Sequence, residues 1–470
     1  MAITRRQFIT RTGLASGGLL VPAWLANPGV REARADIGNR YLVVIHLDGG
    51  NDGLNTVTPI DDGGGTLRTD YEGARDNLRI PAGSLLPIGA DSATGAQLGL
   101  NPALAGVKAL FDAGRCAILQ GCGYPEPRLS HDGSKRAWQT GHPIVDDANV
   151  SGWIGDSLVS LGYGGTNIPA VNIGAIIAPS FEQTATSVIA VQTLDDLGFA
   201  YDLDFPADDA AKRACFATLY DEASATEQNQ LAHLGSTGAA ALVASESFAE
   251  GYETARASWN AAYDDLDTAP ARDLREVAKV IYGVSTGAPG MEARFFHVRL
   301  DGYDTHSSQG LAVPGARHYE LLRAFGDALQ LFHDDCTDMG VGDELCILVW
   351  SDFGRRIQQN GNGTDHGSLA PMFVVGGSIA GGLYGAHPNI TPGVLDMNGN
   401  TTYSQAPANP WRARDFRDVY GTILKHWCGL TEGTILSQVL TPEPVSFDPD
   451  LYWVDGNHGF DMAFLPPPGP

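Results

Sequence analysis

The feature that most constrains this chain is a short apolar run that ends in a glycine-rich loop. The run, residues 41–47, is rich in β-branched residues and is followed at once by Asp48 in the segment DGGNDG. A short, continuous apolar segment bounded by glycines is typical of a strand buried on both faces of a parallel sheet. Ligands of open α/β sheets bind at the carboxyl ends of strands, so Asp48 is a candidate site residue as well as an ordinary turn residue.

The same alternation continues along the chain and predicts an α/β fold with a mostly parallel central sheet. Further strands are predicted at residues 116–120, 168–173, 294–300, 345–350 and 371–375. Helices are predicted at residues 101–113, 130–140, 152–162, 314–339 and 413–427. Asn101 is expected to cap the first of these helices, with Pro102 at its first position. Residues 61–100 are predicted to form a long irregular connection that could include a short strand.

A different composition appears between residues 205 and 285. Long alanine-rich, acidic stretches there predict helices whose charged faces are solvated. We interpret this span as a helical insertion in an α/β domain that covers residues 36–470.

The first 35 residues read as an export signal. Thr4-Arg5-Arg6-Gln7-Phe8-Ile9 is a twin-arginine pattern, a weakly apolar stretch follows over residues 12–26, and Ala33-Arg34-Ala35 is a cleavage site. The order predicts export of the folded protein by the Tat translocase to the periplasm or the medium. The apolar stretch is too short and glycine-rich for a stable membrane span, and no later segment is apolar enough.

Charge and cysteine content exclude several classes of function. A formal net charge of −25 argues against nucleic acid and anionic lipid as partners. It also repels anionic substrates, so a phosphate or sulfate site needs local positive charge such as a metal. The six cysteines form no C-x-x-C pair, which excludes a zinc ribbon or thioredoxin motif. Export to an oxidising compartment permits disulfides, whereas folding in the cytoplasm before export disfavours their formation.

Several loops next to predicted strands carry carboxylates or imidazoles. These residues are Asp48, Asp304, His306, Asp352 and His366. If the strands are parallel neighbours, the side chains converge at one edge of the sheet. Such a mixture suits Zn²⁺ or Mn²⁺, whereas Mg²⁺ or Ca²⁺ prefers more oxygen. Ser130, at a helix start, is suited to nucleophilic attack beside a metal.

Other catalytic templates fail. The chain contains no G-x-S-x-G elbow and no phosphate-binding P-loop motif. The Asp48 segment mimics the start of an EF-hand, but its third position is Gly50 and its twelfth is Pro59.

A set of motifs then resembles a known family over essentially the whole mature chain. The motifs are LDGGNDGLN, RLSH, WQTG, DGYDTH, SDFGRR and TDHGxxxPMFVxGG. They resemble the exported bacterial domain-of-unknown-function family fifteen-oh-one, which is grouped with the alkaline phosphatase and sulfatase superfamily. The resemblance implies an α/β/α sandwich with two metal ions at the carboxyl edge of its sheet.

The resemblance also implies roles for individual residues. Asp48 and Asp352 match metal-binding aspartates, and Ser130 is similar in position to the nucleophile. Asp304 resembles the aspartate that opens a D-x-x-x-H ligand pair, and His366 resembles a late metal histidine.

Two departures from the superfamily pattern stand out. Phe353 occupies the place of a histidine ligand, and His306 lies two residues early. His131 or His46 could substitute for the missing imidazole. Arg355 and Arg356 could supply positive charge to an oxyanion, or form ordinary salt bridges.

Two functions are compatible with these observations. The first is an exported hydrolase of small phosphate or sulfate esters that uses one or two divalent metal ions. The second is a catalytically degenerate binding or assembly protein that keeps the fold and one structural metal.

Overall fold

The computed structural model describes most of the chain after the predicted signal. The described residues are 37–124, 127–142, 150–163, 168–183, 186–194, 209–224, 231, 234–235, 238–239, 251–288, 292–391, 414–440 and 459–465. The predicted twin-arginine signal over residues 1–35 lies outside them.

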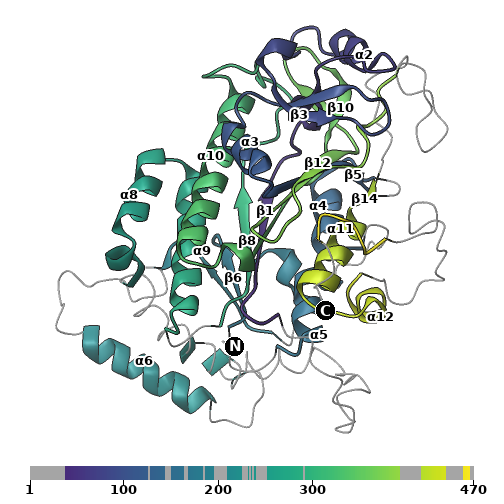
Figure 1. The fold of residues 1–470 in the computed structure, drawn as a ribbon. Helices are drawn as coiled ribbons and strands as arrows, with labels where there is room; N and C mark the ends of the chain where they lie inside the picture. The colour runs from purple at the N-terminus through teal and green to yellow at the C-terminus, as the bar shows by residue number, and fades with distance from the viewer. Residues whose placement is uncertain are drawn as a thin grey trace, which may run out of the picture. The chain divides into compact units, whose positions relative to one another are not determined.

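A nine-stranded, mostly parallel sheet forms the centre of the domain (Figure 1). Its main path runs β13-β5-β12-β9-β1-β8-β6-β7, and β14 also pairs with β5. The strands of this sheet are β1 (Tyr41–Leu47), β5 (Cys116–Gly123), β6 (Ala170–Ile173), β7 (Val188–Val191), β8 (Phe295–Leu300), β9 (Leu345–Ser351), β12 (Ala370–Val375), β13 (Gly382–Tyr384) and β14 (Arg414–Asp415). β12 is antiparallel to β5 and β9, and the other pairings are parallel. The predicted fold class is therefore confirmed.

Helices cover both faces of this sheet (Figure 1). The α-helices are α2 (Leu67–Ala74), α3 (Ala105–Asp112), α4 (His131–Thr140), α5 (Trp153–Ser160), α6 (Asp209–Ser224), α8 (Ala257–Leu266), α9 (Ala269–Ser285), α10 (Arg317–Asp338), α11 (Phe416–Thr422) and α12 (Glu432–Thr434). Helices α3, α9 and α10 pack together on one face, with α4, α5 and α11 on the other. Two π-helical turns, Ile423–Trp427 and Ile435–Val439, extend α11 and α12.

The central strand β1 is buried along its whole length because both faces are covered. Its alternate residues, beginning with Tyr41 and ending with Leu47, join the main apolar core. On the opposite face, His46 stacks on Trp350 of β9 with ring centroids 4.1 Å apart, and Trp350 stacks on Trp138 of α4 at 5.5 Å. One aromatic stack thus joins the strands that end at the candidate site to the helix that follows β5.

The prediction of an irregular connection with room for a short strand underestimates the regular structure of residues 61–100. This span contains α2, β3 (Leu86–Ala90) and β4 (Gln97–Leu100), and β2 (Val57–Pro59) completes a small antiparallel sheet in the order β2-β4-β3. The strands are short and include glycine and proline, so they lack the alternation by which strands are recognised.

The start of α3 also differs from the prediction. The helix begins at Ala105 with Leu104 as its N-cap, instead of at Asn101 and Pro102. The Asn101 side chain accepts a hydrogen bond from the Ala103 amide and donates one to the Asn55 carbonyl. Asn101 therefore stabilises a turn that precedes the helix.

Almost all described residues between 205 and 285 are helical: they comprise α6, the helical residues 231, 234–235, 238–239 and 251–255, α8 and α9. α9 contacts α10, β6 and β8, so this helix is part of the layer on the sheet. The limits of an inserted unit stay a prediction.

All six cysteines are free thiols. Cys116, Cys122, Cys336, Cys346 and Cys428 are buried, whereas Cys215 is exposed on α6. Burial raises the pKa of the Cys122 thiol to about 12. Within the described residues, no helix combines the length and the apolar character that crossing a membrane requires.

Candidate metal centre

Three neighbouring parallel strands place the predicted aspartates. β8, β1 and β9 are adjacent, and Asp304, Asp48 and Asp352 follow their respective carboxyl ends. The loops approach closely because Gly49 has a φ of +121°, and a Cβ atom there would lie 2.3 Å from the Asp304 amide nitrogen. The glycine thus permits a contact between two ligand-bearing loops that another residue would block.

Helix α4 brings in the candidate nucleophile and an additional imidazole. Ser130 is its N-cap, and its Oγ accepts a hydrogen bond from the Gly133 amide at 3.3 Å. Gly141, with a φ of 74°, ends the helix in the left-handed conformation. The predicted cap and helix start are confirmed, and His131, the first helical residue, turns towards the aspartates.

His366 reaches the site by a different route from the aspartates. It ends β11 (Thr364–His366), which pairs with β10 (Arg355–Gln359) in a separate antiparallel hairpin. The prediction placed it simply before the strand at residues 371–375. The short hairpin after β9 folds His366 back over the sheet edge, where it meets His306 from the loop after β8.

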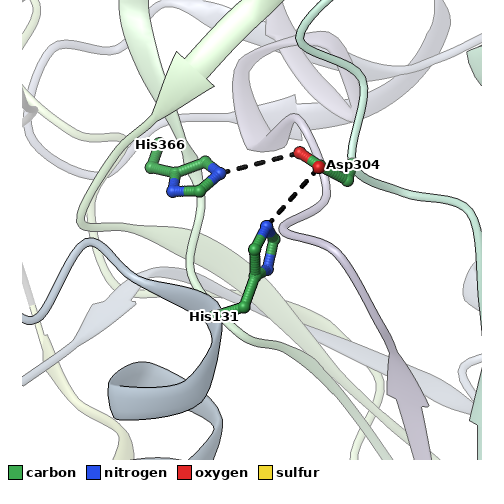
Figure 2. Close-up of side chains that lie close together, drawn as sticks. All are labelled: His131, Asp304 and His366. Carbon is green, nitrogen blue, oxygen red and sulfur yellow. Dashed lines mark ion pairs between the residues drawn. The ribbon is translucent and has the colours of Figure 1, made fainter.

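The first group of side chains consists of His131, Asp304, His306 and His366. Figure 2 shows His131 and His366 each directing a ring nitrogen at the Asp304 carboxylate. The Nε2 atoms of His131, His306 and His366 lie 3.5, 3.2 and 3.6 Å from an oxygen of Asp304. The Nε2 atoms of His306 and His366 are 2.7 Å apart.

Hydrogen bonds on the far side of each ring fix the tautomers in this group. His366 Nδ1 is 2.7 Å from the Leu129 carbonyl oxygen, and a carbonyl only accepts, so this nitrogen carries the proton. His306 Nδ1 likewise donates to Asp365 at 3.0 Å, and His131 Nδ1 donates to Asp352 at 2.8 Å. In their neutral forms, all three rings therefore carry a lone pair on Nε2, and the 2.7 Å separation of the His306 and His366 Nε2 atoms requires a proton or a metal ion between these two rings. Such outer hydrogen bonds are the usual support of metal-binding histidines.

Electrostatics support this arrangement in part. Burial lowers the pKa of His366, which favours the neutral imidazole. Burial opposes ionisation of Asp304, but the hydrogen bond and charge of Arg355 outweigh it and hold the pKa of Asp304 below its ordinary value. The hydrogen bond to Asp352 raises the pKa of His131. A proton on His131 Nε2 would therefore compete with a metal as pH falls.

The second group consists of His46, Asp48 and Asp352 and is almost fully buried. His46 Nε2 donates to Asp352 Oδ1 at 2.5 Å, and His131 donates to the other oxygen. This Asp352–His131 bond joins the two groups. Burial acts against ionisation of Asp352, but the hydrogen bonds from His131 and His46 outweigh it and lower its pKa.

Asp48 is held by two cationic side chains. Lys135 Nζ lies 3.0 Å from Asp48 Oδ1, and an Arg299 guanidinium nitrogen lies 2.5 Å from Oδ2. Lys135 is on α4, one turn after His131, and Arg299 is on β8. The four-residue spacing of His131 and Lys135 is the one sequence signal that could have pointed to the lysine.

The structure does not place Arg355 as a free positive charge for an oxyanion. Its side chain is buried, and its guanidinium donates to the carbonyls of Gly50 and Thr364 at 2.6 and 2.7 Å and to Asp304 at 2.7 Å. Arg355 instead holds the loops after β1 and β8 in place by hydrogen bonds to Gly50 and Asp304. The neighbouring Arg356 donates from Nε to the His366 carbonyl at 3.1 Å.

Phe353 fills the position of the missing histidine with a buried ring. Its centroid lies 4.2 Å from that of His366 and 5.0 Å from that of His131. The phenyl ring packs under the two imidazoles, and His131 contributes an imidazole from another element.

A cavity of about 930 Å³ adjoins the second group. Ser130, His46, Lys135 and Arg299 contribute to its lining. Ser130 is exposed there. The contact that its hydroxyl makes is the cap described above, and its role as a nucleophile stays a prediction.

The five predicted metal residues are thus all present at this edge, divided between two linked groups. Asp304, His306 and His366 lie in the first, and Asp48 and Asp352 in the second. His131 and His46 take the places that sequence reasoning offered only as substitutes. Their function as ligands stays a prediction.

Comparison with known proteins agrees with the resemblance found in the sequence. Residues 284–404 match the family model described as "Protein of unknown function (DUF1501)". No curated protein matches the chain in sequence.

Solved structures similar to this chain include three bacterial proteins. One is a protein in the alkaline phosphatase superfamily from Vibrio parahaemolyticus, at 12% identity over 87% of this chain and 72% of that chain, with a TM-score of 0.35. Another is the phosphonate monoester hydrolase of Agrobacterium radiobacter, at 9% identity over 87% and 79%, with a TM-score of 0.35. A lipoteichoic acid synthase from Listeria monocytogenes is 9% identical over 86% and 74%, with a TM-score of 0.31.

Proposed function

We propose that this DUF1501 protein is an exported, metal-dependent hydrolase of phosphate or sulfate esters. The observation that carries the proposal is the convergence of histidine nitrogens on the Asp304 carboxylate, each ring oriented by a hydrogen bond on its Nδ1. The ligand atoms of His131, Asp304 and His366 lie within 4.8 Å of one another, and His306 Nε2 lies 3.2 Å from Asp304. Lone pairs that face a carboxylate or each other repel, so a cation between them would stabilise the arrangement.

The spacing of the donor atoms fits a tetrahedral metal. Two ligands bound at about 2.1 Å in a tetrahedral arrangement lie about 3.4 Å apart. The three Nε2-to-Asp304 distances are 3.5, 3.2 and 3.6 Å. The pair His306–His366 at 2.7 Å is shorter and would open slightly around an ion. The set of three nitrogens and one oxygen suits Zn²⁺ or Mn²⁺ better than Mg²⁺ or Ca²⁺.

A metal in the first group would polarise the ester and stabilise the charge that develops on it. Ser130, exposed at the wall of the cavity, is the proposed nucleophile. Its Oγ would bond to phosphorus or sulfur as the bond to the ester oxygen breaks; the serine proton would pass to solvent and the leaving oxygen would take a proton from solvent. Water would then hydrolyse the seryl ester and release inorganic phosphate or sulfate with the free serine. Its place at the start of α4 adds the positive end of the helix dipole to the side on which an anion binds.

We also propose that the protein acts outside the inner membrane after export by the Tat translocase, as residues 1–35 indicate. Folding before export lets the metal site assemble in the cytoplasm. Replacement of Arg5 and Arg6 by lysine should retain the protein in the cytoplasm, which fractionation would detect.

Metal analysis of the purified chain, followed by hydrolysis assays with 4-nitrophenyl phosphate and 4-nitrophenyl sulfate, tests the proposed function. We expect bound Zn or Mn and turnover of one of the esters. Ser130→Ala should abolish turnover, keep the metal and lower the free energy of unfolding by about 1 kcal/mol, because a cap is lost. Ser130→Asp should keep the cap and also be inactive.

Two results would contradict parts of this proposal. Wild-type activity in Ser130→Ala would exclude the serine as nucleophile and favour a water molecule. Stoichiometric metal with no turnover of a broad ester panel would favour the degenerate binding protein, in which the metal is structural.

A further inference from the structure

The two groups of side chains differ in where their protons lie. In the first group the histidines direct lone pairs inwards, whereas in the second His46 directs an N–H at Asp352. The oxygens of Asp352 accept from His46, from His131 and from the Gly49 amide at 3.3 Å. The His46–Asp352 pair is therefore largely engaged, because His46 directs an N–H inwards and three of the about four acceptor positions of the Asp352 carboxylate are taken.

Asp48 completes the second group and is equally engaged. Lys135 binds one of its oxygens and Arg299 the other. Arg299 also pairs with Asp301 at 2.8 Å, so Asp48 lies at close range to two permanent cations, one of which it shares with a second aspartate. A divalent ion among them would have to displace the lysine ammonium and would be repelled by the arginine. The second group therefore does not fit a metal ion.

We propose that Lys135 and Arg299 stand in place of a second metal and form a binding site for a tetrahedral oxyanion. Both residues line the 930 Å³ cavity beside Ser130. Their side chains are 26% and 55% exposed, whereas Asp48 is 6% exposed. An ammonium has three N–H donors and a guanidinium five, so both keep donors for an anion after binding Asp48.

The role of Asp48 changes with this assignment. It holds the two cations in position as a counter-ion and is not a metal ligand. The proposed anion would lie between these cations and the first group, where the sulfate or phosphate of an ester meets Ser130. This inference rests on the proposed function for its substrate, but its stoichiometry and anion affinity can be measured without turnover.

The metal content of the wild-type protein separates the two proposals. One Zn or Mn per chain after saturation and desalting is expected. Two per chain would overturn the present inference and leave the proposed hydrolase intact. No metal would contradict the hydrolase, and anion binding would then decide the present inference by itself.

Anion binding is measured by titration calorimetry with inorganic phosphate and with sulfate. Lys135→Met and Arg299→Met should each raise the dissociation constant at least tenfold while the metal content stays at one. Lys108→Met is the matched control, because Lys108 also pairs with an aspartate, Asp112, but lies on α3. It should bind the anions like the wild type.

The variant Lys135→Arg tests whether misfolding, and not the lost charge, explains the weaker anion binding of Lys135→Met. It keeps the charge and should retain most of the anion affinity that Lys135→Met loses. Unchanged anion affinity in both methionine variants would overturn the inference, as would equal loss in Lys135→Arg and Lys135→Met with the fold intact by circular dichroism.

Discussion

At the scale of single residues, the hydrogen bonds behind the histidines bear on the proposed metal site as much as the atoms that face it. Asp365 accepts from His306 Nδ1 and is not itself a ligand. Asp365→Ala should raise the metal dissociation constant about 10–100-fold, because such outer partners orient the ring and raise its basicity. Competition with a chelating dye would measure it. Asp461→Ala is the control, since Asp461 also pairs with a histidine, His426, but outside both groups. Equal losses in the two variants would rule out a specific role for Asp365.

A second residue-scale prediction concerns stability and pH. Burial raises the pKa of Asp418 to about 6 from 3.8, so the folded chain prefers it protonated. Its contribution to stability is therefore full below pH 4 and is lost as pH rises through 6. Asp418→Asn should raise the free energy of unfolding by about 1–3 kcal/mol at pH 8, since one pKa unit corresponds to about 1.4 kcal/mol. The gain should vanish near pH 4, as urea denaturation at both pH values would show. An equal gain in the free energy of unfolding at pH 4 and at pH 8 would contradict the raised pKa of Asp418.

At the scale of the elements, the site depends on how closely the loops after β1 and β8 approach. Gly49→Ala should lower the free energy of unfolding by about 2–4 kcal/mol and weaken metal binding, because its Cβ would meet the Asp304 backbone and its φ is unfavourable for alanine. Gly89→Ala isolates the effect of φ alone. Gly89 has nearly the same φ, of 119°, but a Cβ there meets nothing within 4 Å. Similar losses of stability in the two variants, measured by thermal denaturation, would show that the close approach of Gly49 to the Asp304 backbone is unimportant.

The elements also show why part of the site could be predicted from sequence. Buried parallel strands are continuous apolar runs, so the strand ends at Asp48, Asp304 and Asp352 follow from local pattern. The hairpin β10–β11 does not, because its strands are short and its loop is rich in glycine. The small β2-β4-β3 sheet was missed for the same reason. Its pairing is defined by contacts between segments distant in sequence.

At the scale of the whole molecule, charge should control the encounter with substrate. The net charge of −25 repels an anionic ester from a distance, whereas Lys135 and Arg299 act only locally. Salt shortens the Debye length from about 30 Å at 0.01 M to about 8 Å at 0.15 M. We therefore expect kcat/KM for a phosphate or sulfate monoester to rise several-fold over this range. The binding of an uncharged ester analogue should not change. A fall with salt would mean that local cations dominate the approach.

The composition of the site could be predicted less well than its location. The motifs identified the aspartates, His306 and His366. They did not show that His131 lies in the first group, or that Lys135 and Arg299 form ion pairs with Asp48. Those relations depend on side-chain directions across three elements, α4, β1 and β8. Phe353, where the superfamily has a histidine, shows from sequence that an imidazole is missing. Only the packed structure shows that His131 supplies an imidazole from another element.

The free cysteines have a practical consequence. Five thiols are enclosed in the interior, and Cys215 faces solvent on α6. A maleimide dye added to the native chain should therefore attach at a single position, with no mutagenesis. The fold also requires no oxidant to mature, so the labelled protein can be kept in reductant-treated extracts. Cys215 can therefore serve as a labelling site for testing the proposed export of the folded protein.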